Sequence, residues 1–182
     1  MTVRSAGDRP TEAGTPRPTE RPGASHKFVV EIAPKYGMSD PAGTALLAHL
    51  PSIGVQGVHE IRVSALYEIA GPLTANQVTQ LSRELLSDPI TQDYRLGSST
   101  PSAAFLVGPH WRVEVWLKPT VTDPVGESVC KAIRDMGLPP PDGVRTGAAY
   151  RILGRIGKNH VERILASLLA NPVIHRSTTE RL

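Results

Sequence analysis

Hydrophobic residues recur in the same order in two stretches of the chain, residues 28–93 and 111–176. Each stretch begins with alternating apolar side chains, such as Val30 and Ile32 around Glu31, and this alternation predicts a half-buried strand. A run with apolar residues at three- and four-residue spacing follows and predicts a helix. A second alternating run, a second helical run and a short extended segment complete the set.

The second alternating run is about 12 residues long in both stretches, which exceeds the ordinary length of a strand. We expect a bend, a bulge or a hairpin to divide it, so the predicted plan is β-α-β(β)-α-β. The last extended piece, residues 172–175 in the second stretch, is expected to close the sheet edge. This plan describes a small antiparallel sheet with two helices on one face, close to the ferredoxin-like arrangement. The predicted fold class is α+β.

The two stretches align at a constant offset of 83 residues without any gap. Of the 66 aligned pairs, 17 are identical. A match of this length without an insertion indicates an internal duplication. A single module of about 70 residues buries only about 60% of the surface that its unfolded chain exposes. We therefore expect two tandem ferredoxin-like modules that pack together as an intramolecular pseudo-dimer.

Composition divides the chain into four parts. Residues 1–25 contain four prolines and no aromatic residue, so we expect a disordered tail. The first module takes residues 26–96 and the second takes residues 110–182. The connection between them, residues 97–109, is rich in serine, glycine and proline, which predicts a flexible linker.

Local signals mark where each predicted helix begins and ends. An aspartate followed by proline starts the first helix of each module, since the carboxylate caps free N–H groups and proline suits the first helical turn. A glycine follows each of these helices, where a positive φ closes the C-terminus. The second helix of each module stops before a further proline, because the residue before proline avoids helical dihedrals. These signals are Asp40-Pro41, Asp123-Pro124, Gly54, Gly137, Asp88-Pro89 and Asn171-Pro172.

Composition and charge exclude several classes of protein. The 182 residues carry 20 Lys and Arg against 17 Asp and Glu, and no basic run concentrates the net charge of +3, so nucleic acid is not expected as a partner. No apolar run approaches the roughly 18 residues of a membrane span, and no secretory h-region is present, so we expect a cytoplasmic protein. The single cysteine allows neither an intrachain disulfide nor a cysteine-rich zinc site.

Candidate chemistry is sparse, and no catalytic, cofactor-binding or metal site is predicted. Cys130 lies beside core-facing helix positions without a neighbouring base, which indicates a packed thiol. The six histidines lack metal-ligand spacing. Asp40 and Asp123 are explained as helix caps, and Tyr67 and Tyr150 fall on the apolar side of a strand, where we expect them to pack in the core.

Three motifs of the second module occur in a fixed order: Asp123-Pro124-Val125-Gly126, Val144-Arg145-Thr146-Gly147 and Leu168-Leu169-Ala170-Asn171-Pro172-Val173-Ile174. They resemble the DP-x-G helix start, the VR-x-GK strand and the closing LL-x-NPVI segment of PurS, the small subunit of phosphoribosylformylglycinamidine (FGAM) synthase. Ala148 stands where the lysine is usual, and Ser64 and Ala65 replace the Gly-Lys pair in the first module. The chain thus resembles a tandem duplication of the PurS module, with the role of that lysine left open.

The resemblance implies a function. PurS proteins dimerise and bridge a glutaminase subunit, PurQ, and an ATP-dependent synthetase subunit, PurL, in de novo purine biosynthesis. By resemblance, this chain is a non-catalytic scaffold subunit that assists ammonia transfer in an ATP- and glutamine-dependent carbon–nitrogen ligase complex. ATP and Mg²⁺ are then expected on the synthetase, and this chain is expected to hold no cofactor. A different class stays open, a small-molecule-binding regulatory module of the ferredoxin-like type.

The resemblance also points to interface residues. The closing segment of the second module keeps the family pattern, so Leu169 is a candidate apolar anchor, and Asn171 and His175 are candidate polar contacts with a partner. The alternative for each residue taken singly is that Leu169 packs in the core and that Asn171 only caps the chain ahead of Pro172. Pro172 in the same segment and Arg145 in the strand motif complete the predicted interface. Because the first module departs further from the pattern, the second is expected to carry more of the contact.

Overall fold

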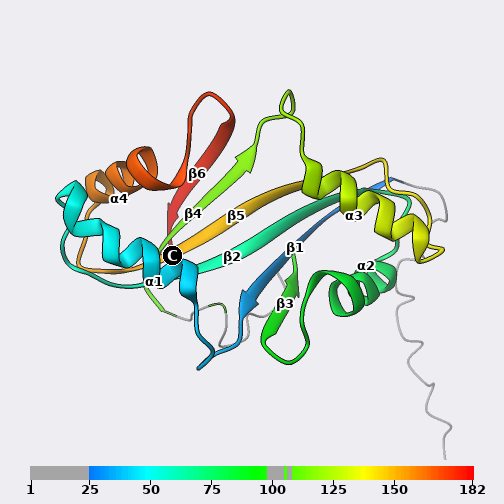
Figure 1. Ribbon diagram of the computed structural model, residues 1–182, viewed down its shortest axis with the longest axis horizontal. Coiled ribbons are helices and arrows are strands. Elements are labelled where there is room, and N and C mark those ends of the chain that lie inside the picture. The colour runs from blue at the N-terminus through cyan, green and yellow to red at the C-terminus, as the bar shows by residue number, and fades with distance from the viewer. Residues whose placement is uncertain (1–24, 98–104, 106–107) are drawn as a thin grey trace, which may run out of the picture.

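The structure of the chain is a computed structural model that describes residues 25–97, 105 and 108–182. Within these residues the chain forms one six-stranded antiparallel sheet in the order β3-β1-β2-β5-β4-β6 (Figure 1). The predicted tail except Ser25, and most of the predicted linker, lie outside the described residues. The elements are β1 (His26–Pro34), α1 (Pro41–His49), η1 (Leu50–Ile53), β2 (Val58–Gly71), α2 (Ala75–Leu81), η2 (Ser82–Leu86), β3 (Gln92–Leu96), β4 (Trp111–Leu117), α3 (Pro124–Asp135), β5 (Gly143–Gly154), α4 (Lys158–Ile164), η4 (Leu165–Leu169) and β6 (His175–Arg181).

The duplication seen in the sequence is also present in the structure. Helices α2 and α4 are 83 residues apart at both ends, and so are η2 and η4. The two halves meet along β2 and β5, and the central pair of that ladder, Ala65 and Ala148, is again 83 residues apart. A twofold rotation about this pair exchanges the halves, so the chain is an intramolecular pseudo-dimer. We call residues 26–96 repeat 1 and residues 110–182 repeat 2, and two residues 83 apart are twins.

Two details differ from the sequence-based prediction. The long strand is not divided: β2 runs for 14 residues and β5 for 12, with one register irregularity between Val58 and Glu60. Each strand stays whole because it pairs with the other along its length and with β1 or β4 on its opposite side. The last edge strand begins at His175 rather than at Pro172, because residues 172–174 form a turn.

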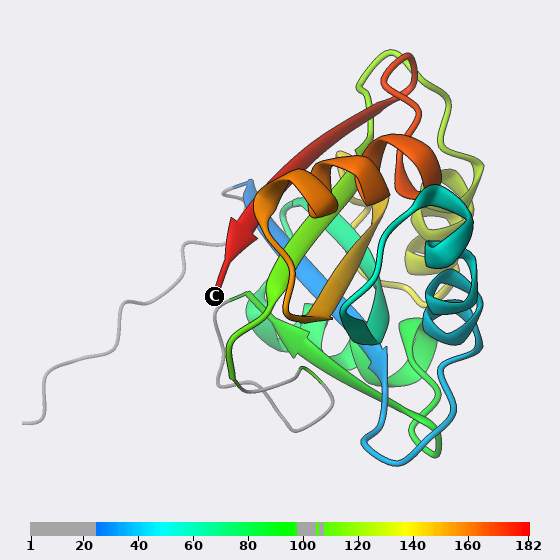
Figure 2. The same cartoon turned by 90° about the vertical axis from the view of Figure 1, so that its left-hand side faces the viewer.

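All four α-helices lie on one face of the sheet, as the side view shows (Figure 2). They cover it in two pairs, and each pair joins helices from different repeats. The core under α1 and α4 includes Leu46 of α1 and Ile164 of α4. The core under α2 and α3 joins Val78 of α2 to Ile133 of α3. Each repeat therefore depends on the other to complete a hydrophobic core.

The Asp-Pro-x-Gly motif ties a helix to a strand. The Asp123 carboxylate accepts a hydrogen bond from the Gly126 N–H at 2.8 Å and another from the Thr146 N–H of β5 at 2.6 Å. It caps α3 and also satisfies a strand donor that lies beyond the end of β4. The predicted helix caps are confirmed, and the twin contacts in repeat 1 join Asp40 to Gly43 and Val63, each at 2.8 Å.

Glycine is required at the fourth position of this motif because the helix lies so close to the strand. A Cβ on Gly126 would lie 2.4 Å from the backbone oxygen of Val144, and a Cβ on Gly43 would lie 2.1 Å from that of Ile61. Both distances are far below van der Waals contact. A larger residue would force α1 or α3 away from the sheet.

Replacing Gly126 by alanine is expected to lower the free energy of unfolding by about 2 kcal/mol, since α3 must shift away from β5. In a chain of this size, that loss corresponds to a fall of about 4–8 °C in melting temperature. Gly143→Ala is the matched control, because a Cβ there meets nothing within 4 Å. Equal melting temperatures of the two variants, followed by circular dichroism, would contradict the prediction.

Candidate functional site

Two of the predicted interface residues, Asn171 and Pro172, lie in the loop between η4 and β6, and a third, His175, begins β6 at the edge of the sheet (Figure 1). Asn171 shapes this loop: its side-chain oxygen accepts a hydrogen bond from the Val173 N–H at 2.9 Å, and its own N–H donates to His175 Nδ1 at 3.1 Å. Pro172 is exposed, and its carbonyl oxygen accepts a hydrogen bond from the Lys118 ammonium group. The polar side chains of this loop thus hold its backbone shape.

Leu169 and Arg145 lie away from the surface of this loop. Leu169 is 7% exposed and belongs to the core under α1 and α4, so its side chain packs inside the protein. Arg145 precedes Thr146 on β5, and the Thr146 hydroxyl bonds Asp123 on the helix side, so alternation directs Arg145 to the other face. Among the described residues no hydrogen bond or ion pair to the Arg145 side chain is present, and Arg145 lines a cavity of about 670 Å³.

A twin of this loop lies at the opposite edge of the sheet, between η2 and β3 (Figure 1). Ile90 and its twin Val173 are each 75% exposed at the two loops. Lys35, after β1, and its twin Lys118, after β4, each donate a hydrogen bond to a backbone carbonyl of the neighbouring loop. Each loop is therefore fastened and carries an exposed apolar side chain. We call them the first tip (residues 87–91) and the second tip (residues 170–174).

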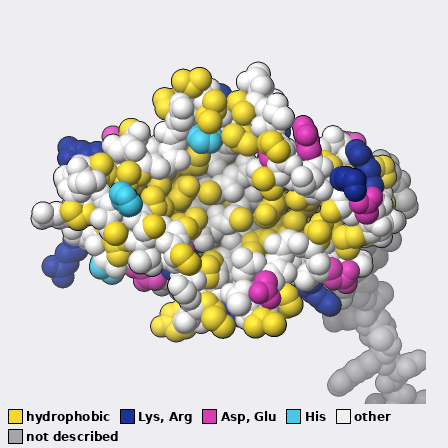
Figure 3. Space-filling model, in the orientation of Figure 1, with side chains coloured by type: hydrophobic (Ala, Val, Ile, Leu, Met, Phe, Trp, Pro, Cys, Tyr) yellow, Lys and Arg dark blue, Asp and Glu magenta, His cyan; other side chains and the backbone are white. Residues whose placement is uncertain are grey.

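The helix-bearing face is hollowed over the middle of the sheet, and apolar side chains gather there (Figure 3). Tyr150 and its twin Tyr67 are half-buried on this face and pack against the two cores, in agreement with the packing predicted for them. Burial raises the pKa of Tyr150, and burial together with the charge of Asp123 raises the pKa of Tyr67. A pocket of about 270 Å³ on this face is lined by Val115, Leu117, Thr146, Gly147, Ala148, Tyr150, Leu169 and His175.

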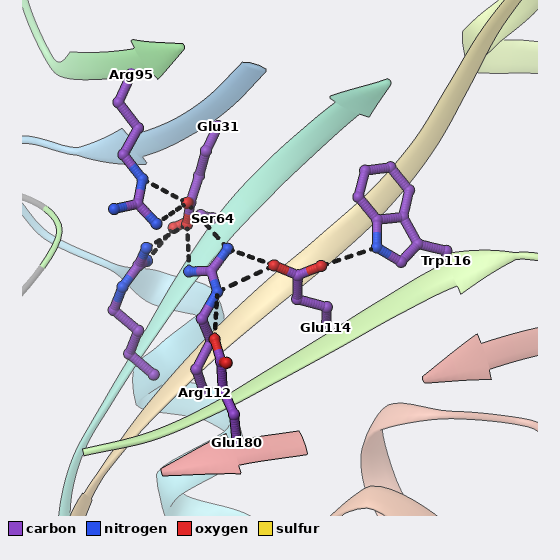
Figure 4. Close-up of polar contacts among 8 residues, drawn as sticks. Glu31, Ser64, Arg95, Arg112, Glu114, Trp116 and Glu180 are labelled. Carbon is purple, nitrogen blue, oxygen red and sulfur yellow. Dashed lines mark hydrogen bonds and ion pairs between the residues drawn. The ribbon is translucent and has the colours of Figure 1, made fainter. Parts of the chain in front are cut away.

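The opposite, helix-free face of the sheet carries charged side chains that are buried. Glu31 of β1 is 3% exposed, and Arg112 of β4 and Arg151 of β5 are 6% and 1% exposed. The Glu31 carboxylate accepts hydrogen bonds from Arg112 at 3.1 and 3.2 Å and from Arg95 at 2.8 Å (Figure 4). It also accepts one from Arg151. Three guanidinium groups from three different strands therefore surround one carboxylate.

The same network continues in repeat 2. Arg112 donates to Glu114 at 2.6 Å, and Trp116 Nε1 donates to the other Glu114 oxygen at 3.1 Å (Figure 4). Arg151 also donates to the Ser64 hydroxyl at 2.8 Å. The network connects the repeats across the sheet, and we call it the ion cluster: Glu31, Ser64 and Arg95 from repeat 1, and Arg112, Glu114, Trp116 and Arg151 from repeat 2.

The electrostatics of the ion cluster are dominated by mutual neutralisation. Burial by itself would raise the pKa of Glu31, because a buried carboxylate is poorly solvated. The guanidinium groups of Arg151, Arg112 and Arg95 outweigh that effect and lower the pKa of Glu31 from 4.5 to about 2. Burial lowers the pKa of Arg151 to about 10. Both side chains are therefore charged at neutral pH.

One linker residue covers part of the ion cluster. Phe105 is 1% exposed and packs against Ala33. The centre of its ring lies 5.0 Å from the guanidinium carbon of Arg95 and 5.2 Å from that of Arg151, which are cation–π distances. The linker composition predicts flexibility, but Phe105 is fixed by its packing against Ala33 and by its contacts with the two guanidinium groups.

The ion cluster is the feature that sequence reasoning missed. Alternation assigned Glu31 and Arg151 to the face opposite the apolar one, and such a face ordinarily contacts solvent in an antiparallel sheet. One signal for burial was available. The stretch between β3 and β4 holds a single aromatic residue, Phe105. Because these two strands are four places apart in the sheet, that stretch must cross between them, and its aromatic side chain can cover the charged face.

Within residues 25–97, 105 and 108–182 no group of three or more possible metal ligands lies together, and no helix is long and apolar enough to cross a bilayer. Cys130 is a free thiol packed at the edge of the core under α2 and α3, as predicted. The carboxylate and guanidinium groups of the ion cluster bind one another and thereby join the two repeats.

Comparisons with known proteins agree with this architecture. The family model described as PurS, phosphoribosylformylglycinamidine (FGAM) synthase, matches residues 27–99 and again residues 110–181. Among solved structures, the chain is similar to PurS of Methanocaldococcus jannaschii, one of the subunits of formylglycinamide ribonucleotide amidotransferase in the purine biosynthetic pathway. That match has 27% identity and a TM-score of 0.33, and it covers 41% of this chain and 96% of the other. No curated protein matches.

One antiparallel sheet built from two related halves, with helices on one face, defines an α+β protein with tandem ferredoxin-like modules. Both halves match the same family model, and together the matches span most of the chain. The chain belongs to the PurS family, as a tandem duplication of the PurS module. Its role is that of an FGAM synthase subunit in purine biosynthesis.

Glu31 predicts how stability changes with pH. Because its pKa in the folded chain is about 2 rather than 4.5, its contribution is fully present above pH 4.5 and is lost as pH falls toward 2. That contribution is about 3 kcal/mol of unfolding free energy. Glu31→Gln should be less stable than the wild type at pH 7, and this difference should shrink steadily below pH 4.5.

Urea unfolding at several pH values between 2 and 7 measures the effect. Glu162→Gln serves as the control, because Glu162 is exposed and forms only a surface ion pair with Lys158 at 3.7 Å. That variant should follow the wild-type curve. A constant offset between Glu31→Gln and the wild type across the whole pH range would show that the carboxylate is not held ionised by the arginines.

Proposed function

We propose that this chain is the non-catalytic bridging subunit of FGAM synthase. In this role it holds a glutaminase subunit, PurQ, and a synthetase subunit, PurL, in one complex. The observation that carries the proposal is that both halves of the chain match the PurS family, so a whole PurS pair is present in a single polypeptide.

The chemistry of the reaction explains why a bridge is useful. Ammonia released from glutamine must reach the synthetase before it escapes into water. Holding the two active sites in a fixed relation makes that transfer effectively intramolecular, which is a proximity effect. In the proposed complex this chain contributes position, while ATP, Mg²⁺ and the reacting groups belong to the synthetase and the glutaminase.

The two tips support a bridging role because a bridge needs two docking surfaces that face different directions. The first tip lies beside β3 and the second beside β6, at opposite edges of the sheet (Figure 1). Each presents a twin apolar side chain, Ile90 or Val173, that is 75% exposed. Aliphatic side chains that protrude from a fastened loop are suited to insertion into a partner's pocket.

A single chain should replace the pair of small subunits. Its two repeats share their cores and the ion cluster, so the pseudo-dimer is complete without a second copy. We therefore expect one such chain per synthetase. Native mass spectrometry of the reconstituted complex counts the chains directly, and two copies per synthetase would contradict this stoichiometry.

Reconstitution tests the bridging role itself. With PurL and PurQ from the same organism, glutamine-dependent formation of FGAM should require this chain, and it should fall at least tenfold, on the order expected from lost proximity, when the chain is omitted. Ammonia-dependent formation by PurL should change far less. The isolated chain should show neither activity. A glutamine-dependent rate that is the same with and without the chain would reject the proposal.

The tips can be tested with twin substitutions. Val173→Asp and Ile90→Asp should each leave the melting temperature within about 3 °C of the wild type, because both side chains are exposed. Val173→Asp should weaken binding to one partner subunit by about tenfold or more, and Ile90→Asp should weaken binding to the other less strongly. Surface plasmon resonance with each subunit separately measures this. Wild-type affinity of both variants for both subunits would remove the tips from the interface.

A further inference from the structure

The two repeats have the same backbone plan but different charges on the helix-free face. Glu31 has a glutamate as its twin, Glu114. The two arginines of repeat 2 that neutralise Glu31 do not have arginines as their twins in repeat 1. The twin of Arg151 is Glu68, with the opposite charge, and the twin of Arg112 is Val29, with no charge. The face is therefore symmetric in shape and asymmetric in charge.

This asymmetry has a consequence for pairing. In a pair made of two copies of repeat 1, the twofold arrangement would place Glu68 of the other copy where Arg151 now contacts Glu31. It would place Val29 where Arg112 now lies. Glu31, which is 3% exposed, would keep only Arg95 of its own repeat and would face a second carboxylate. Like charges at a buried position are strongly unfavourable.

The twin of the Glu31–Arg151 contact is a pair of carboxylates, Glu114 and Glu68, which lie at a more exposed position. Glu114 and Glu68 line the same cleft of about 540 Å³ on the helix-free face. The Glu114 side chain is 29% exposed and the Glu68 side chain 14%. Each also has a cation of its own repeat, because Arg112 lies 2.6 Å from Glu114 and Lys27 lies 3.1 Å from Glu68. Two carboxylates are tolerated there because both are more exposed than Glu31 and each is paired with its own cation.

We propose that the helix-free face is a selective pairing surface, on which repeat 1 accepts repeat 2 and rejects a second repeat 1. Arg112 and Arg151 provide the attraction, since they neutralise Glu31 only when repeat 2 is the partner. Glu68 provides the rejection, since it would bring a negative charge to Glu31 in the wrong pair. The proposal concerns the assembly of this chain with itself and is independent of its role in FGAM synthase.

A single substitution in the full chain reproduces the contact that Glu31 would meet in a pair of two repeats 1. Arg151→Glu presents to Glu31 the charge that a second repeat 1 would present. It should lower the melting temperature by about 10 °C, as expected for a buried ion pair turned into a buried repulsion. The matched control is the twin substitution Glu68→Arg. It places a guanidinium near Glu114 and removes the ion pair of Glu68 with Lys27, whose side chain is 63% exposed. Because an exposed ion pair contributes little, the melting temperature should stay within about 3 °C of the wild type or rise above it.

Two more variants separate charge from lost packing. Arg151→Met removes the charge and keeps the length of the side chain, so it should melt above Arg151→Glu. Glu31→Gln should lower the melting temperature of the wild type but raise that of Arg151→Glu, because it then removes a repulsion. If Arg151→Glu does not fold, recovery of a cooperative transition in the Arg151→Glu, Glu31→Gln double variant gives the same information.

Three results would overturn the proposal. Equal melting temperatures of Arg151→Met and Arg151→Glu would show that charge at this position does not matter. A loss on Glu31→Gln of the same size in both backgrounds would show that the two residues are not coupled. A fall for Glu68→Arg as large as that for Arg151→Glu would show that the face does not distinguish the repeats.

Discussion

Antiparallel pairing of β2 with β5 joins the two repeats from Val58–Gly154 to Ala70–Gly143, and most features of the molecule follow from it. The pairing makes one continuous sheet out of two three-stranded halves and sets a twofold arrangement around Ala65 and Ala148. On the helix-bearing face, this arrangement brings α1 beside α4 and α2 beside α3, so that each core is shared. A module of about 70 residues would be marginal alone, and sharing both cores solves that problem without a second chain.

On the other face, the same pairing places side chains from opposite repeats within reach of one another. Glu31 meets Arg112 and Arg151 there, and Phe105 covers two of the guanidinium groups bound to that carboxylate. Burying charges costs free energy even when they are paired, so an ion cluster is a weak source of stability compared with an apolar core. What it provides is discrimination, because Glu31 is neutralised when repeat 2 is the partner and would not be neutralised by a second repeat 1. The shared cores therefore supply most of the stability, and the ion cluster selects the partner.

The architecture also suits the functional class. In the proposed bridging role the two tips are the docking surfaces, since each presents an apolar side chain that is 75% exposed. The tandem arrangement keeps the two tips in a fixed relation, which two separate small subunits achieve only by association. A bridge of this kind acts through geometry. Its rigidity comes from an undivided central strand pair and from helix starts fastened to that pair by Asp40 and Asp123.

The sequence by itself determined the duplication, the helix starts at Asp40 and Asp123, the family and the α+β plan, because each depends on local hydrogen bonds or on a repeated pattern. The predicted interface stays a prediction: Asn171 and His175 shape an exposed loop, and Leu169 packs inside a core. Only the tertiary structure decided that the long strands remain whole and that Glu31 is buried. The partners of Glu31 lie 64, 81 and 120 residues further along the chain, and a charged strand face looks the same in sequence whether water or arginine will neutralise it.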